Sequence, residues 1–293
     1  MILLFDKDTV QKMLFLQKGE ITDYIIYKKL ARNQKSDHNK EILNNIAEDE
    51  LNHYHFWEQY TKTKVKPNRF KVFFFFFIAR IFGLTFGIKL MERGEVETQE
   101  VYNELKDKIS GIQQLIDDEE EHEKELIDAL DEEKLKYVGS IVLGLNDALV
   151  ELTGTLAGLS FAFANPRYVA LAGLITGIAA SLSMASSEYL STKQESSHGF
   201  ALKSALYTGV AYVFAVAFMI LPYLLLTNVY ASLLSTIVIV ILIIFVFNYY
   251  ISVAKDFSFK KRFFEMVSIS LGVALLSFGI GILVKSFLGI DIG

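Results

Sequence analysis

The sequence predicts an all-α protein in two parts, a charged four-helix bundle followed by a membrane domain of five helices. Three observations lead to this prediction. Only three prolines occur in 293 residues, so helices can run long. Residues 138–293 contain five apolar stretches of spanning length, and residues 1–137 contain a duplicated pattern of glutamate, tyrosine and histidine at helical spacing.

Charge is distributed very unevenly between these two parts. Residues 1–137 hold 27 of the 34 acids and 21 of the 29 bases, whereas residues 138–293 hold only 7 acids and 8 bases. The net charge of −5 therefore belongs to the first part. A length near 300 residues allows two domains, and this asymmetry indicates that one lies in water and the other in lipid.

Composition also excludes several classes of function. The chain has no cysteine, which excludes disulfides, a thiolate nucleophile, Cys-ligated zinc and iron–sulfur clusters. Neither half carries the basic excess of a nucleic-acid-binding protein, so we expect no nucleic acid among the partners. Residues 1–10 lack the basic and then apolar layout of a signal peptide.

The first part contains a repeat that predicts a metal site. Residues 18–30 align without gaps on residues 93–105, with Glu, Tyr and Leu at the same offsets, and a Glu-x-x-His follows each copy. One Glu from each of two helices, plus Glu-x-x-His from each of two others, is the ligand set of a di-iron or di-manganese bundle. The predicted ligands are Glu20, Glu50, His53, Glu95, Glu119 and His122.

Several neighbouring residues extend this prediction. Tyr27 and Tyr102 lie two turns beyond the repeated glutamates on the same face, where each can hydrogen-bond a ligating carboxylate. Glu92, one turn before Glu95, is a candidate additional ligand. Residues 117–133 are so acidic that one Glu-x-x-His there is equally typical of a solvated charged face. The occurrence of two ordered copies favours the metal site.

With this spacing, residues 10–133 resemble rubrerythrin-type ferritin-like domains. The resemblance implies a centre of two iron ions, as Fe²⁺ or Fe³⁺, with manganese as the alternative, that reacts with O₂ or peroxide. It implies the same six ligands. The rubredoxin-like Cys₄ module often attached to rubrerythrin cannot exist in a chain without cysteine, so that source of electrons for peroxidase turnover is missing.

An apolar segment separates the two helical hairpins of the repeat and includes five consecutive phenylalanines at 73–77. It is long enough to span a bilayer, but a crossing here would place the two hairpins on opposite sides and divide the site. We therefore predict a crossover helix at 72–90 on the membrane surface; the alternative is a helix wholly buried in protein. Bases that would meet anionic headgroups precede it: Lys62, Lys64, Lys66, Arg69 and Lys71.

The second part is predicted to cross a bilayer five times. The expected spans are residues 138–163, 168–190, 201–225, 229–252 and 263–288. Loops on the side of the first part carry eight Lys and Arg residues, whereas the other side has only Arg167 and Lys285. The positive-inside rule then predicts a multi-pass protein of the cell membrane, with a cytoplasmic bundle and the C-terminus on the opposite side.

Acidic residues inside the predicted spans indicate a transport path. Asp147 and Glu151 share one face of the first span, ~14 and ~20 Å from Val138 at ~1.5 Å per residue. Acids at such depth are costly and call for a functional explanation. Met184, at a similar counted depth, and Glu188 share a face of the second span, and carboxylates with a thioether suit Fe²⁺ or Mn²⁺. Packing for Met184 and an interface position for Glu188 are the alternatives.

Two motifs in these spans resemble the vacuolar iron transporter family. They are Gly-Leu-Asn-Asp-Ala-Leu-Val at 144–150 and Ser-Met-Ala-Ser-Ser-Glu-Tyr-Leu-Ser at 183–191. The resemblance covers about 138–290 and implies export of cytosolic Fe²⁺ or Mn²⁺ in exchange for protons, through a homodimer. It places Asp147, Met184 and Glu188 on the pathway.

The sequence also departs from that family in two places. Ser187 stands where the family usually has glycine. The acidic cytosolic helices between the second and third spans are missing, and the short loop 193–203 takes their place. Another part of the chain must then capture the metal.

The two parts together predict a divalent metal transporter in which the bundle captures or senses the metal. No catalytic residue is predicted for this function. The alternatives are a membrane-anchored di-iron oxidase or peroxidase with the spans as scaffold, and an iron-responsive sensor without flux. Asp147 at its counted depth favours transport, because an anchor does not need a buried acid.

Overall fold

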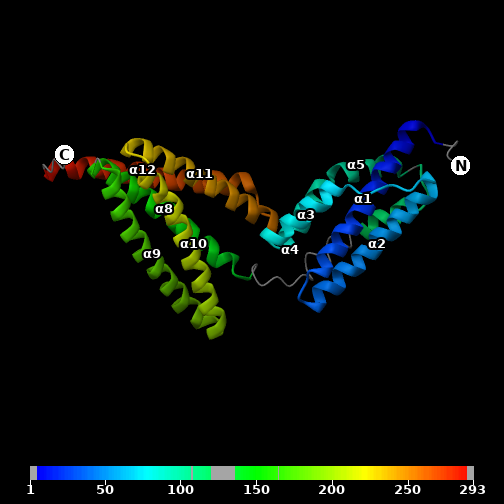
Figure 1. The fold of residues 1–293 in the computed structure, drawn as a ribbon, viewed down its shortest axis with the longest axis horizontal. Helices are drawn as coiled ribbons and strands as arrows, with labels where there is room; N and C mark the ends of the chain where they lie inside the picture. Colours follow the sequence, from blue (N-terminus) through cyan, green and yellow to red (C-terminus); the bar gives the residue numbers. More distant parts are fainter. Residues whose placement is uncertain (1–4, 107, 120–135, 164, 289–293) are drawn as a thin grey trace. The chain divides into compact units, whose positions relative to one another are not determined.

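The computed structural model describes residues 5–106, 108–119, 136–163 and 165–288. Every regular element among these residues is a helix, which confirms the predicted all-α class (Figure 1). The chain divides into two compact units, Met1–Glu132 and Glu133–Gly293, and each is described by itself.

Two long antiparallel helices form the frame of the first unit. Helix α1 (Lys7–Arg32) begins after Asp6, whose carboxylate accepts a hydrogen bond from the Thr9 amide at 2.9 Å. Helix α2 (Asp37–Thr61) begins after Ser36, whose hydroxyl caps it in the same way. Such caps satisfy amides that have no partner within the helix, and so they fix where each helix starts.

A core of large side chains joins these two helices to α5 (Val96–Leu105) and to the helical residues 112–119. Trp57, the only tryptophan of the chain, is fully buried in this core. The other buried members are Met13, Leu16, Tyr102, Leu105, Ile109, Ile112 and Leu115. Four helical segments therefore pack around one apolar centre.

The crossover segment forms two helices, so the prediction of one continuous helix at 72–90 is wrong. Helix α3 (Arg69–Phe82) ends at Gly83, where φ is +108°, and α4 (Leu84–Glu92) follows at once. A Cβ added to Gly87 would lie 2.5 Å from the Ala79 Cβ, so α4 folds back closely against α3. The 3₁₀ turn η2 (Arg93–Glu95) then leads into α5.

The second unit consists of five long helices, and their extents agree with the five predicted spans. They are α8 (Val138–Phe163), α9 (Pro166–Glu195), α10 (His198–Leu225), α11 (Val229–Ala254) and α12 (Phe259–Leu288). Over the described residues, all five are long and apolar enough to cross a membrane. Residues 196 and 197 alone separate α9 from α10. These helices fit a multi-pass membrane protein.

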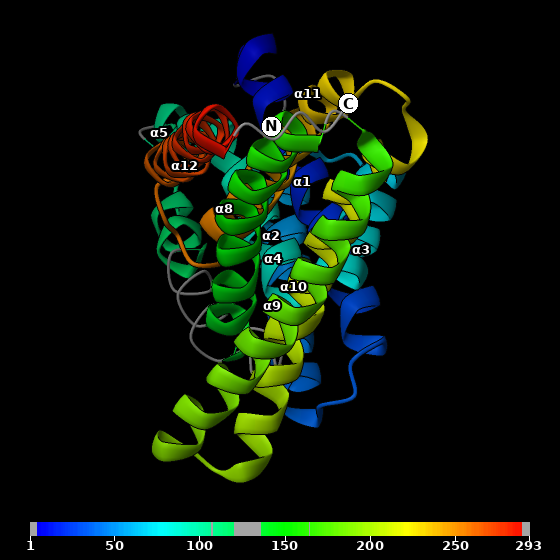
Figure 2. The same ribbon diagram turned by 90° about the vertical axis from the view of Figure 1, so that its left-hand side faces the viewer.

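Glycines allow the helices of this unit to approach closely. A Cβ on Gly144 would collide with the carbonyl oxygen of Thr208, which brings α8 against α10. A Cβ on Gly177 would lie 2.7 Å from Val216, which brings α9 against α10 (Figure 2). A Cβ on Gly154 would lie 2.8 Å from the Ser277 hydroxyl oxygen, which brings α8 against α12. In a membrane the burial of apolar side chains does not drive helices together, so small residues that permit close backbone packing favour helix association.

Candidate metal centre and transport path

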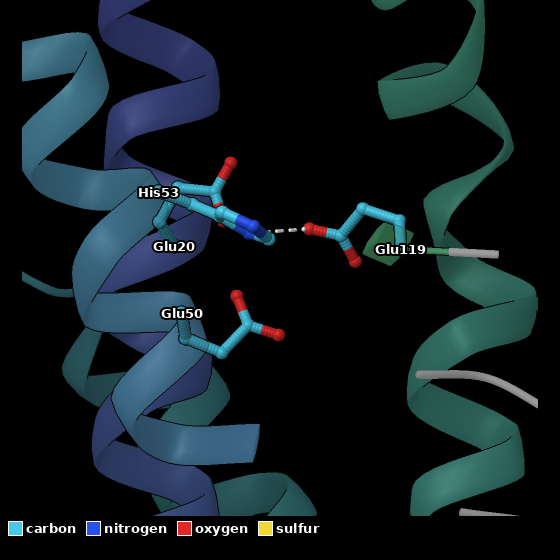
Figure 3. Close-up of side chains that lie close together, drawn as sticks. All are labelled: Glu20, Glu50, His53 and Glu119. Atoms are coloured by element: carbon cyan, nitrogen blue, oxygen red, sulfur yellow. Dashed lines mark ion pairs between the residues drawn. The ribbon is translucent and has the colours of Figure 1, made fainter. Parts of the chain in front are cut away.

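Four of the six predicted ligands lie together in the first unit. Glu20, Glu50, His53 and Glu119 each offer a ligand atom, and these atoms all lie within 4.8 Å of one another (Figure 3). Glu20 comes from α1, Glu50 and His53 come from adjacent turns of α2, and Glu119 comes from the helical residues 112–119. The site therefore joins segments about 100 positions apart in sequence, as the repeat predicted.

The two α2 ligands point the same way because three residues make nearly one helical turn. Glu20, Glu50 and His53 are buried, and Glu119 is half-buried. The Nδ1 atom of His53 lies 2.9 Å from a Glu119 carboxylate oxygen and 3.7 Å from a Glu20 oxygen. The imidazole thus lies between carboxylates from two other segments.

Two aromatic side chains hold the Glu20 carboxylate in place. The Tyr102 hydroxyl donates to Oε1 of Glu20 at 2.8 Å, which is the kind of hydrogen bond predicted for this tyrosine. The Trp57 indole N–H donates to the same oxygen at 3.2 Å. Both rings are buried, and their centroids lie 6.0 Å apart. Hydrogen bonds of this kind orient a ligating carboxylate, leaving its other oxygen to bind a cation.

Crowded negative charge shifts the proton affinities of the site. Burial, together with the carboxylates of Glu119 and Glu20, raises the pKa of Glu50 well above its usual range. Burial alone would lower the pKa of His53, but its hydrogen bonds and charge interactions with Glu119 and Glu20 raise that pKa to about 10. Protons therefore offset part of the negative charge that a bound cation would neutralise.

The donor set fits a divalent transition metal. Three carboxylates supply hard oxygen ligands and charge, and one imidazole supplies a nitrogen, a combination that suits Fe²⁺ or Mn²⁺. The buried, preassembled geometry distinguishes this cluster from an exposed acidic patch. The side chains of Glu92 and Glu95, and the whole of His122, lie outside the described residues. Tyr27 is buried in the core formed by α1, α2, α3 and α4.

Sequence reasoning missed two residues at this site. Trp57 lies four residues after His53, so both side chains share one face of the helix, and it is the sole tryptophan of the chain. These two features could have indicated that Trp57 belongs to the site. Asp118 lies 3.7 Å from the second ring nitrogen of His53, and its side chain is 41% exposed. No pattern could have singled out Asp118 among the many acids that surround it.

The predicted path residues occupy adjacent helices of the second unit. Asp147, Met184 and Glu188 are half-buried in this chain, and Glu151 is exposed. The Tyr212 hydroxyl on α10 donates to Glu151 at 3.0 Å. No hydrogen bond or ion pair among the described side chains joins Asp147, Met184 and Glu188 directly to one another.

The α8–α9 register determines the order of these residues along the helices. The Ser140 hydroxyl of α8 donates to Glu188 of α9 at 2.7 Å, so these two positions are nearly level. Counting back along antiparallel α9 then places Met184 about level with Gly144, one turn short of Asp147. By this register Met184 lies ~4.5 Å nearer the Ser140 end than Asp147, at ~1.5 Å per residue, whereas counting from the helix ends gave the two residues a similar depth. From the Ser140 end, the order is Glu188, Met184, Asp147, Glu151.

Comparison with known families addresses the second unit alone. Residues 138–199 match the sequence model of the VIT family. The match begins with α8 and includes both motifs of α8 and α9, so it supports a metal-transporter domain of the vacuolar iron transporter type in this part. No curated protein matches the chain at significant similarity.

Proposed function

We propose that this chain exports cytosolic Fe²⁺ or Mn²⁺ across the cell membrane in exchange for protons, and that its N-terminal unit captures or senses the metal. The observation that carries the proposal is the acidic face of α8. Asp147 and Glu151 stand one turn apart in an apolar helix within the segment that matches the VIT family. Acids in such a helix are retained where ions or protons move.

Along this path each side chain has a distinct task. Glu188, bonded to Ser140, would receive the cation near one end of α8. Met184 would offer a thioether to a partly dehydrated transition metal, which favours Fe²⁺ or Mn²⁺ over Ca²⁺. Asp147 and Glu151 would accept the cation in turn and then take up protons, with Tyr212 holding Glu151 in position. The family resemblance further supports a homodimer.

The cluster in the first unit supports its proposed role as a capture or sensing site. Only two residues link α9 to α10, so this chain lacks room there for the acidic cytosolic helices expected from the family resemblance. Glu20, Glu50, His53 and Glu119 provide an alternative set of ligands. A ferritin-like centre of two metal ions, completed by Glu95 and His122, accounts for the duplicated sequence pattern.

Flux into proteoliposomes tests the transport proposal. We expect Asp147→Asn to abolish Fe²⁺ flux and the accompanying proton movement, because the amide keeps the shape but loses the charge. Glu195→Gln is the matched control, since Glu195 is exposed at the end of α9. Unchanged Fe²⁺ flux in Asp147→Asn would overturn the assignment of the path.

A second function, a membrane-anchored di-iron oxidase or peroxidase, is favoured by the Tyr102 and Trp57 hydrogen bonds to Glu20. Oxidisable aromatic rings next to a metal ligand suit a centre that reacts with peroxide. Replacing Glu50 and His53 together by alanine should abolish peroxide-dependent oxidation of Fe²⁺ by the full chain. If Fe²⁺ flux persists in this variant, transport and oxidation are separate activities. If the wild-type chain shows oxidation without flux, the second function replaces the first.

A further inference from the structure

Helix α3 exposes a continuous face of large apolar side chains. We call this the aromatic face; its members are Phe70, Phe73, Phe74, Phe77 and Ile81. Phe70 is 75% exposed and Phe73 is 64% exposed, although a phenylalanine is normally among the more buried residue types. Exposed apolar side chains gathered on one face, outside the candidate spans, mark an interaction site.

The aromatic face follows from the helical repeat. At about 100° per residue, its five members fall within a sector about 100° wide, which is the width of a typical buried stripe. The opposite side of α3 already has its partners. Val72 and Ala79 are buried there, and Phe75 and Phe76 pack on the core shared with α1, α2 and α4. The aromatic face is thus a second apolar surface, separate from the one that holds α3 to the bundle.

Positive charge borders this face on both sides. By the same helical count, Arg69 and Arg80 lie along one edge and Lys71 lies along the other, and all three are exposed. The preceding connection adds Lys62, Lys64 and Lys66, which are also exposed. Residues 62–91 contain seven bases and no acid, although acids outnumber bases over the chain as a whole.

We propose that the aromatic face of α3 inserts into the interfacial layer of a bilayer that contains anionic lipids. An apolar stripe with basic edges matches acyl chains below and negatively charged headgroups beside them. The same chain carries five candidate membrane spans, beginning at Val138, so a bilayer is available to this helix. The fold-back of α4 at Gly83 leaves α3 as an amphipathic surface helix too short to cross.

This contact would hold the metal-binding unit against the membrane through a second attachment, besides the covalent one. Membrane binding by one amphipathic helix is weak and reversible. Because this helix is covalently tethered to spanning helices, its binding is effectively intramolecular, and the high effective concentration strengthens it. The proposal is independent of metal chemistry and of transport. The result of its test therefore does not depend on whether the chain transports Fe²⁺.

The absence of cysteine makes a direct test simple, because a single cysteine can be introduced without removing any other. Full-length Phe77→Cys is spin-labelled and placed in nanodiscs of equal parts phosphatidylcholine and phosphatidylglycerol. Collisions of the label with O₂, which concentrates in lipid, are compared with collisions with a water-soluble nickel chelate. Asn45→Cys is the matched control, because Asn45 is an exposed, uncharged position on α2.

We expect the label at Phe77 to collide more often with O₂ and several-fold less often with nickel than the label at Asn45. Nanodiscs of phosphatidylcholine alone, or Lys62, Lys64 and Lys66 replaced together by Gln, should weaken this difference. Equal nickel collisions at both sites would overturn the proposal. Protection from both reagents would also overturn it, because protein then covers the face; broadening between labels would identify that protein as a second copy.

Discussion

Tyr102→Phe is the sharpest test of the candidate metal centre. The change removes one hydroxyl and leaves the ring in its buried position. In the wild-type chain this hydroxyl donates to Glu20 at 2.8 Å, and Glu20 also accepts from Trp57. The variant therefore loses one of two donors that orient the carboxylate, while all four ligands remain.

The expected loss of metal affinity follows from that hydrogen bond. A hydrogen bond to an ionised group contributes ~1.5–3 kcal/mol. At about 1.4 kcal/mol per factor of ten, affinity should fall by roughly 10- to 100-fold, in line with other groups that support a metal ligand. We expect Mn²⁺ binding to weaken by this factor and the fold to stay intact.

Trp57 supplies the assay. It is the only tryptophan, and its indole N–H lies 3.2 Å from a Glu20 oxygen, so its fluorescence should change when Mn²⁺ binds. The full chain is titrated with Mn²⁺ at an excitation wavelength that tyrosine does not absorb. Tyr60→Phe is the control, because the Tyr60 hydroxyl donates to the Ser110 carbonyl oxygen and not to a ligand. Equal Mn²⁺ affinity for Tyr102→Phe and Tyr60→Phe would refute the reasoning.

Three further predictions concern protons, packing and the path. The raised pKa values of Glu50 and His53 mean that Mn²⁺ must displace protons when it binds. An indicator dye should therefore record proton release, and the affinity for Mn²⁺ should fall as pH falls. Binding that does not depend on pH would contradict this. Gly144→Ala should lower the free energy of unfolding by ~1–3 kcal/mol, because the added Cβ would overpack against Thr208. Gly139→Ala is the control and should be near neutral, since nothing lies within 4 Å of its added Cβ. Thermal denaturation of both variants measures the difference. Tyr212→Phe should slow Fe²⁺ flux by freeing Glu151, whereas Tyr207→Phe should not; equal rates would exclude the positioning role.

The agreement between sequence and structure is best where the signal is local. Five apolar runs predicted five helices of spanning length, because the length and hydropathy of a segment decide whether it can cross a bilayer. The spacing of Glu50 and His53 predicted that both side chains lie on one face of α2, because residues three apart are nearly one helical turn apart. The repeat then indicated which distant glutamates would join them, and Glu20 and Glu119 do.

The disagreements concern contacts between segments. An isolated glycine in an apolar run is compatible with a continuous helix, and the break at Gly83 depends on the close approach of Ala79 and Gly87. Trp57 became part of the site because α1 and α2 are antiparallel with Glu20 opposite it. The Ser140–Glu188 hydrogen bond sets a register between α8 and α9 that places Met184 about one turn from Asp147, and residue counting along two separate helices does not give that register.

The sequence by itself determined the helical class, the five apolar helices and the chemical types of the proposed ligands, since these follow from composition and from spacing within one helix. Only the tertiary structure decided that Trp57 also bonds Glu20, where the crossover folds back, and which face of α3 stays exposed. Those outcomes depend on side-chain packing between residues far apart in sequence, such as Glu20 and Trp57 at 37 positions, and no local pattern encodes that packing.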